Sequence, residues 1–260
     1  MRRHLHILTV LAAFAASCGL AQAQTVTAIK IDSIKKATES FLVLAKDADT
    51  TGKPPRYSDP AVKPLLDTIL NTKDLEGGKP LPWASVQMLH EWNQATQKVG
   101  LIYYLAGTGT TDPLAVSKDP QKIIKANSNT AAFAYEFGRY YDAQMRILGA
   151  MIDSAIAQTA TITPEQRKDP VLRRILNNIS DDTARAVTGL LGTFVLDGLQ
   201  DDWMLLRVVA LLEITPKAAK FLAPDDRSQL KNAAAEVAEH VSNPDVKGGI
   251  NAIARAFATY

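Results

Sequence analysis

Proline directly follows a helix-capping residue at seven places after residue 58, and this repeated signal constrains the fold more than any other feature of the chain. The side-chain oxygen of Asp, Asn or Thr can accept a free backbone N–H in the first turn of a helix. Proline loses no hydrogen bond at the first helical position, because that N–H has no helical partner in any case. Each pair therefore predicts a helix start: Asp59-Pro60, Asp112-Pro113, Asp119-Pro120, Thr163-Pro164, Asp169-Pro170, Thr215-Pro216 and Asn243-Pro244.

Between these pairs the apolar residues recur at helical spacing, and no segment shows the sustained alternation of a strand. The sequence therefore predicts an all-α fold, an irregular bundle of about ten helices. The alternative is a partly solenoid-like arrangement of helix pairs in the C-terminal half. We expect helices at 27–46, 60–71, 83–106, 129–158, 170–179, 181–199, 201–213, 216–222, 225–242 and 245–258, with uncertain ends. Segment 107–128 gives no clear pattern of its own; its opening "GTGTTDP" is expected to be a plain loop, since a phosphate loop needs a preceding strand and a following Lys-Ser/Thr.

The first 23 residues are typical of a secretory signal peptide: two arginines, an apolar run and the small-residue site Ala21-Gln22-Ala23. Cleavage after Ala23 would remove Cys18, the only cysteine, and leave residues 24–260 as a single all-α domain without disulfides. In the alternative, Cys18 becomes a lipid anchor, but the residues before it match a lipoprotein signal only in part. We therefore expect a periplasmic or secreted protein.

The charge balance argues against nucleic acid as a partner. Removal of the signal peptide takes Arg2 and Arg3 from the 29 basic residues and leaves 27 against 27 acidic residues. Phosphate binding is built from clustered Lys and Arg, and no basic run is present. No transmembrane segment is expected after signal removal, because the apolar runs at 203–212 and 189–199 are short and carry Arg207 and Asp197.

The residues that usually carry catalysis or bind metals are scarce, and we predict no catalytic residue, metal or cofactor. The mature chain has two histidines, His90 and His240. His90 begins "HEWNQ", where Gln94 replaces the second histidine of a zinc-protease helix, and a solvated His90 is expected. His240 follows Glu236 by one turn, which is typical of a surface pair. The acidic pairs 181–182 and 201–202 are expected to cap helix starts.

The aromatic residues are unevenly distributed. Nine of the sixteen in the mature chain fall on two expected helices, which should face one another: Trp83, Trp92, Tyr103, Tyr104, Phe133, Tyr135, Phe137, Tyr140 and Tyr141. Gln144 lies in the middle of the resulting apolar stripe, and Glu136 lies at its edge. This pattern indicates either an aromatic core with satisfied polar groups or a partly apolar pocket. The candidate ligand-binding residues are Trp92, Tyr103, Glu136, Tyr140, Tyr141 and Gln144.

We therefore expect an exported helical protein of the bacterial cell envelope that acts as a non-enzymatic binding or interaction module. Its partner would be an unidentified protein or a small apolar ligand. Two alternatives remain open: an envelope hydrolase whose site is assembled only in the fold, and a carrier of a small apolar or aromatic ligand.

Overall fold

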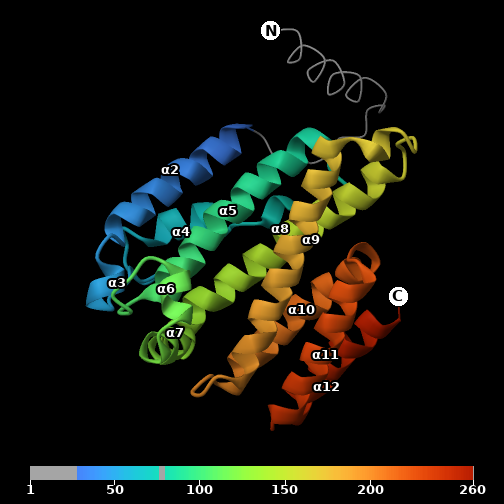
Figure 1. Ribbon diagram of the computed structural model, residues 1–260. Coiled ribbons are helices and arrows are strands. Elements are labelled where there is room, and N and C mark those ends of the chain that lie inside the picture. The colour runs from blue at the N-terminus through green and yellow to red at the C-terminus, as the bar shows by residue number, and fades with distance from the viewer. Residues whose placement is uncertain (1–27, 76–79, 260) are drawn as a thin grey trace.

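The computed structural model describes residues 28–75 and 80–259, so the expected signal peptide and Cys18 lie outside the described residues. Within these ranges the chain forms α-helices and short 3-10 turns and no strand (Figure 1). The all-α prediction is confirmed. The α-helices are α2 (Ala28–Leu44), α3 (Ala48–Thr51), α4 (Lys63–Leu70), α5 (Trp83–Leu105), α6 (Pro113–Ser117), α7 (Pro120–Ala132), α8 (Ala134–Thr159), α9 (Pro170–Gly192), α10 (Asp201–Phe221), α11 (Pro224–His240) and α12 (Pro244–Ala258).

Helix α8 lies between two groups of helices. On one side it packs against α5, which also contacts α2 and α4. On the other side it packs against α10, which contacts α12, and α12 pairs with α11. Figure 1 shows these groups in blue to green and in orange to red, with α9 in contact with both α8 and α11. Because α10 contacts α8, α9 and α12, the C-terminal half is part of a bundle and not a stack in which each pair touches only its neighbours.

One connected apolar core runs from α2 to α12. Its largest fully buried side chains include Trp92, Tyr103 and Phe41. Helices α10 and α12 approach especially closely at Gly249, where an added Cβ would lie 2.3 Å from a methyl carbon of Val208. A larger residue at 249 would therefore push these two helices apart.

Four of the seven expected helix starts are confirmed with their caps in place. The carboxylates of Asp112, Asp119 and Asp169 and the amide of Asn243 accept first-turn N–H groups of α6, α7, α9 and α12. In α9, for example, Asp169 Oδ1 accepts from the backbone N–H of Val171 at 2.7 Å.

The other three pairs do not begin α-helices. Asp59 caps a turn, and α4 begins later, at Lys63. Thr163 accepts from the backbone N–H of Gln166 before a 3-10 turn. The prediction at Thr215-Pro216 is wrong, because both residues lie inside α10 and Thr215 Oγ1 donates to the Leu211 carbonyl at 2.6 Å.

Two further boundaries differ from expectation. Segment 107–128 opens with a loop as expected and then forms α6 and most of α7, which begin at the predicted Asp-Pro pairs but for which no helix range was given. The four short helices expected between 170 and 222 are two long ones, α9 and α10. The acidic pair 181–182 therefore lies in the middle of α9 and caps nothing. The pair 201–202 lies in the first turn of α10 as expected, but the N-cap of that helix is Gln200 and makes no side-chain cap bond.

None of the described helices is both long and apolar enough to cross a bilayer.

Candidate functional site

The expected facing of the two aromatic helices is confirmed, because α5 and α8 pack along much of their length. Tyr103 of α5 contacts Phe133, just before α8, and Phe137 in α8, with ring centroids 5.6 and 6.3 Å apart. Phe137 contacts Tyr141 at 5.9 Å, and Tyr141 contacts Tyr140 at 4.7 Å. The aromatic side chains thus form one continuous series of ring contacts between the helices.

Two of the candidate residues are fully buried and have polar partners. Trp92 donates its indole N–H to the Ile69 carbonyl at 2.6 Å, and Tyr103 donates its hydroxyl to the Pro55 carbonyl at 2.7 Å. Burial raises the pKa of Tyr103 well above the usual value of a phenol. These two side chains join α5 to the segment that contains α4, and they contribute to the core.

Glu136 is buried and paired. Its carboxylate accepts from Arg56 Nε at 2.9 Å and from the backbone N–H of Tyr57 at 3.2 Å. The glutamate is 2% exposed, whereas Arg56 is half-exposed and also lies over the Phe133 ring, 5.0 Å from its centroid. Glu136 therefore fastens the loop before α4 to the start of α8, and a ligand that used this carboxylate would have to replace Arg56.

Tyr140 packs against Gly100 and the neighbouring rings, and its hydroxyl is in hydrogen-bond contact with the side chain of Gln144. The Tyr140 ring packs directly on Gly100, where an added Cβ would lie 2.7 Å from the ring. Gln144 is 3% exposed, and its Oε1 has no hydrogen-bond partner. Burial raises the pKa values of Tyr140 and of Tyr141, the latter to about 12, so both phenols are neutral at physiological pH.

Arg207 of α10 is a functional candidate that the sequence analysis did not identify. Its side chain is 1% exposed, and Nε and Nη1 have no hydrogen-bond partner. Nη2 donates weakly, at 3.4 Å, to the Thr130 carbonyl, and the guanidinium lies 5.5 Å from the centroid of the Tyr141 ring. Burial lowers the pKa of Arg207 to about 10, which still leaves it positively charged near pH 7. The only sequence signal was a charged residue inside an otherwise apolar run.

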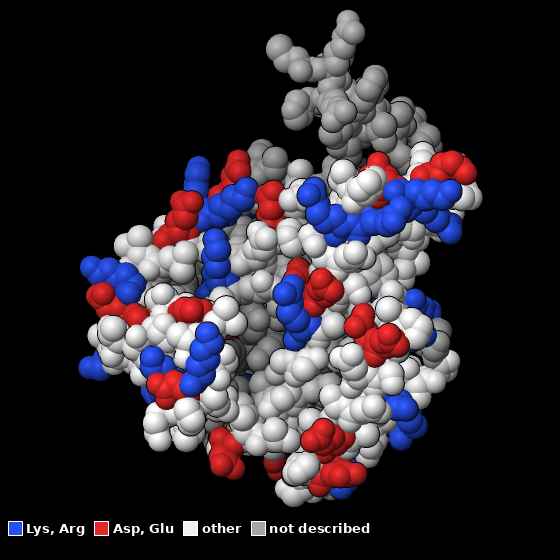
Figure 2. Space-filling view, viewed as in Figure 1, with Lys and Arg blue, Asp and Glu red and all other residues white. Residues whose placement is uncertain are grey.

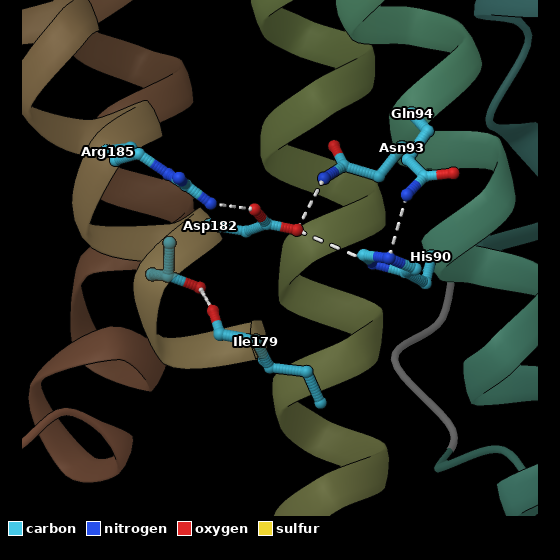
Figure 3. Close-up of polar contacts among 7 residues, drawn as sticks. His90, Asn93, Gln94, Ile179, Asp182 and Arg185 are labelled. Carbon is cyan, nitrogen blue, oxygen red and sulfur yellow. Dashed lines mark hydrogen bonds and ion pairs between the residues drawn. The ribbon is translucent and has the colours of Figure 1, made fainter. Parts of the chain in front are cut away.

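A second polar cluster joins α5 to α9. Figure 3 shows His90, Asn93 and Gln94 of α5 across from Asp182 and Arg185 of α9. His90 Nδ1 lies 3.5 Å from Asp182 Oδ2, which also accepts from Asn93 at 3.3 Å. Arg185 donates to the other carboxylate oxygen, Asp182 Oδ1, at 2.7 Å. The expectation of a solvated His90 is wrong, because its side chain is only 22% exposed and Nδ1 is buried against Asp182.

The arrangement around His90 limits its chemistry. A hydrolytic His–Asp pair needs its second ring nitrogen free to take a proton from a nucleophile. Here Nε2 lies 3.0 Å from the Gln94 amide nitrogen, which can donate to it. In this conformation Gln94 occupies Nε2, and Nδ1 lies within ion-pair distance of Asp182 without a hydrogen bond, so the imidazole is part of a structural polar cluster.

The other polar residues near these helices have ordinary roles. His240 Nδ1 lies 2.9 Å from the backbone carbonyl of Glu236, so the expected side-chain pair is a side-chain to backbone contact. Asp142 and Arg146 form the i,i+4 ion pair that their spacing favours, with a 3.0 Å contact. In the parts of the chain that the structure describes, no group of three or more His, Cys, Asp or Glu side chains could hold a metal ion.

Comparison of the chain with protein-family models, with curated proteins and with solved structures finds no match.

Proposed function

We propose that this chain is an exported binding module of the bacterial cell envelope, which holds a small ligand with an anionic group beside Arg207. The observation that supports the proposal is a buried guanidinium with two nitrogens that lack partners. Export rests on the signal-peptide pattern of the first 23 residues.

The buried, unpaired guanidinium of Arg207 lowers the stability of the folded protein. Removing a charged group from water costs several kcal/mol, which a nearby opposite charge and full hydrogen bonding normally offset. Arg207 lacks both. Its hydrogen bond to the Thr130 carbonyl is long, and the cation–π contact with the Tyr141 ring offsets only part of the cost of burying the charge. A carboxylate supplies the missing charge and acceptors, and guanidinium groups bind carboxylates strongly.

The surroundings of Arg207 suggest the rest of the ligand. Tyr141 and Tyr140 are in ring contact, and Gln144 lies one turn further along α8 with an unused Oε1. A ligand with a flat apolar body and a carboxylate matches the aromatic rings and the cation, and a donor on that body, such as an indole N–H, would pair with Gln144 Oε1. This proposal keeps three of the sequence-derived residues and assigns Trp92, Tyr103 and Glu136 to the support of the site.

A hydrolase is the second candidate, and the observation that favours it is the His90–Asp182 pair. It ranks second because Gln94 occupies the ring nitrogen that would accept a proton from a nucleophile. Assembly of such a site would require Gln94 to move aside.

Thermal unfolding with matched ligands tests the proposal on the mature chain, residues 24 to 260. Benzoate and indole acetate are compared with benzamide and indole acetamide, which keep the rings but lack the charge. Wild type should be stabilised by at least one carboxylate and by neither amide, because a ligand that binds only the folded state raises the melting temperature. Arg207→Met should lose this response, and Arg255→Met, at an exposed arginine, should keep it.

Gln144→Leu gives a second measurement at the same site. It should weaken the response to indole acetate, whose N–H can donate to Gln144 Oε1, while it changes the free energy of unfolding by no more than about 1–3 kcal/mol in either direction, the cost of one buried polar group. The proposal fails if no carboxylate stabilises wild type, or if Arg207→Met responds as wild type does.

A further inference from the structure

Four cationic side chains are clustered where α9 begins. Arg167 and Lys168 belong to the 3-10 turn before this helix, and Arg173 and Arg174 follow within its first two turns. All four are exposed. Figure 2 shows Lys and Arg atoms in a nearly continuous row over the upper end of α9, at the edge of the molecule. We call these four residues the basic strip, and the expectation of a surface without clustered Lys and Arg is wrong at this point.

The hydrogen bonds recorded for the basic strip go to backbone carbonyls. Arg167 donates to the Thr159 carbonyl at 3.2 Å, and Arg173 donates to the Lys168 carbonyl at 2.9 Å. The nearby carboxylate of Asp169 instead caps α9, where it accepts backbone N–H groups. Glu165 is the other acidic residue in this segment, so the cations outnumber the acids four to two over residues 165–174.

The position of two of the cations opposes the helix dipole. The N-terminal end of a helix carries a partial positive charge and favours acidic side chains. Helices α10 and α11 follow this rule with two aspartates each in their first turns. Helix α9 has no acidic residue in its first turn and has Arg173 and Arg174 in the second turn. Helix stability therefore does not account for these arginines.

The surface next to the strip is open and partly apolar. A hollow of about 520 Å³ is lined by Pro170, Arg173, Arg174, Asn177, Asn178 and Asp181. Val171 is 46% exposed between the two pairs of cations. The hollow offers guanidinium and amide donors at a scale that suits an anionic headgroup, and Val171 offers an apolar contact beside them.

We propose that the basic strip docks this protein onto an anionic lipid surface. Lys and Arg side chains close to such a surface each contribute to binding, and an exposed apolar residue between them can enter the headgroup region. Nucleic acid fits less well, because segment 160–181 has no aromatic residue on which bases could stack. The inference is independent of the ligand proposed for Arg207.

Vesicle co-sedimentation tests the inference with the mature chain, residues 24 to 260. The probes are vesicles of phosphatidylcholine alone and of phosphatidylcholine with phosphatidylglycerol. The chain should bind the anionic vesicles, should release from them when salt is raised from 0.15 to 0.5 M, and should not bind the neutral ones. Each basic residue near the surface is worth roughly fivefold in affinity.

Two variants that each remove four cations distinguish the effect of the basic strip on binding from the effect of net charge. Arg167→Gln, Lys168→Gln, Arg173→Gln and Arg174→Gln together should weaken binding to anionic vesicles by roughly 100-fold or more. The control removes four other exposed cations, with Lys36→Gln, Lys46→Gln, Lys247→Gln and Arg255→Gln, and should lose much less. Equal losses in the two variants, equal binding to neutral vesicles, or binding to duplex DNA but not to vesicles would overturn the inference.

Discussion

Gly100 is the residue that permits the contact between α5 and α8 at Tyr140. An added Cβ would lie 2.7 Å from the Tyr140 ring, which is closer than carbon atoms pack. The Tyr140 ring cannot easily move away from the added Cβ, because it also packs against Phe137 and Tyr141, with centroid distances of 6.3 and 4.7 Å. The small size of residue 100 is therefore needed for the aromatic packing.

Gly100→Ala should lower the free energy of unfolding by about 1–2 kcal/mol, since overpacking outweighs the gain in helix propensity. Gly189→Ala is the control, because Gly189 lies inside α9 and its added Cβ would meet nothing within 4 Å beyond the local backbone of that helix. This variant should gain up to about 1 kcal/mol. Urea unfolding of both variants measures the difference. Equal effects at the two glycines would contradict the packing described here.

The lowered pKa of Asp67 in α4 should make the stability of the protein sensitive to acid. Burial would raise the pKa of its carboxyl, but hydrogen bonds from Lys63, Tyr57 and Arg139 outweigh burial and lower the pKa from 3.8 to about 2. A carboxyl with a lowered folded-state pKa stabilises the protein above the unfolded-state value, and this contribution is lost as pH falls toward the folded-state value.

Wild type should therefore lose stability between pH 4 and pH 2 more steeply than Asp67→Asn, which lacks the titrating group. The urea midpoints of the two proteins should differ most near neutral pH and converge as pH approaches 2. Midpoints that diverge in acid would show that Asp67 does not carry this effect.

At the scale of single helices, two prolines show that the same residue type can begin a helix or lie inside one. Pro170 is at the first position of α9, where Asp169 caps the helix, whereas Pro216 is inside α10 and removes a hydrogen bond to the Leu212 carbonyl. Pro216→Ala should raise the free energy of unfolding by about 1–2 kcal/mol, after allowance for the more flexible unfolded chain.

Pro170→Ala is the matched control and should be neutral or lose up to about 1 kcal/mol, because this proline is already compatible with its position. Urea unfolding compares the two variants. A loss at Pro216 as large as that at Pro170 would contradict this prediction and show that α10 tolerates its internal proline without cost.

The helices could be predicted from sequence wherever the signal was local. The caps Asp112, Asp119, Asp169 and Asn243 all use side chains that bond to backbone groups two or three residues away. The same local rule failed at Pro216, because packing of α10 against α8 and α12 holds the helix together through the proline. It failed also at Asp182, which looked like a cap but bonds to Asn93, 89 residues away.

At the scale of the whole molecule, the unpredicted parts of the site all depend on contacts between distant helices. The aromatic series was recognisable from composition and helical period, so its members and their facing could be predicted. Arg207 meets Tyr141 and Thr130 only when α10 packs beside α8, and His90 meets Asp182 only when α9 crosses α5. No spacing within either segment encodes these pairings.

Surface charge and a lipid anchor are the two ways in which we propose that this protein could attach to a membrane, and the mass of the protein after export would distinguish them. Cleavage after Ala23 predicts a mature chain that begins at Gln24, contains no cysteine and carries no lipid. Such a chain should meet a membrane only through surface charge, and salt should therefore release it. Its melting temperature should not change with reductant, because no disulfide can form.

A lipid on Cys18 would instead give the mass of residues 18 to 260 plus acyl chains, and salt would then leave the protein on the membrane. Intact-mass measurement of protein recovered from the envelope, before and after a high-salt wash, distinguishes these outcomes, and an acylated species would refute cleavage after Ala23.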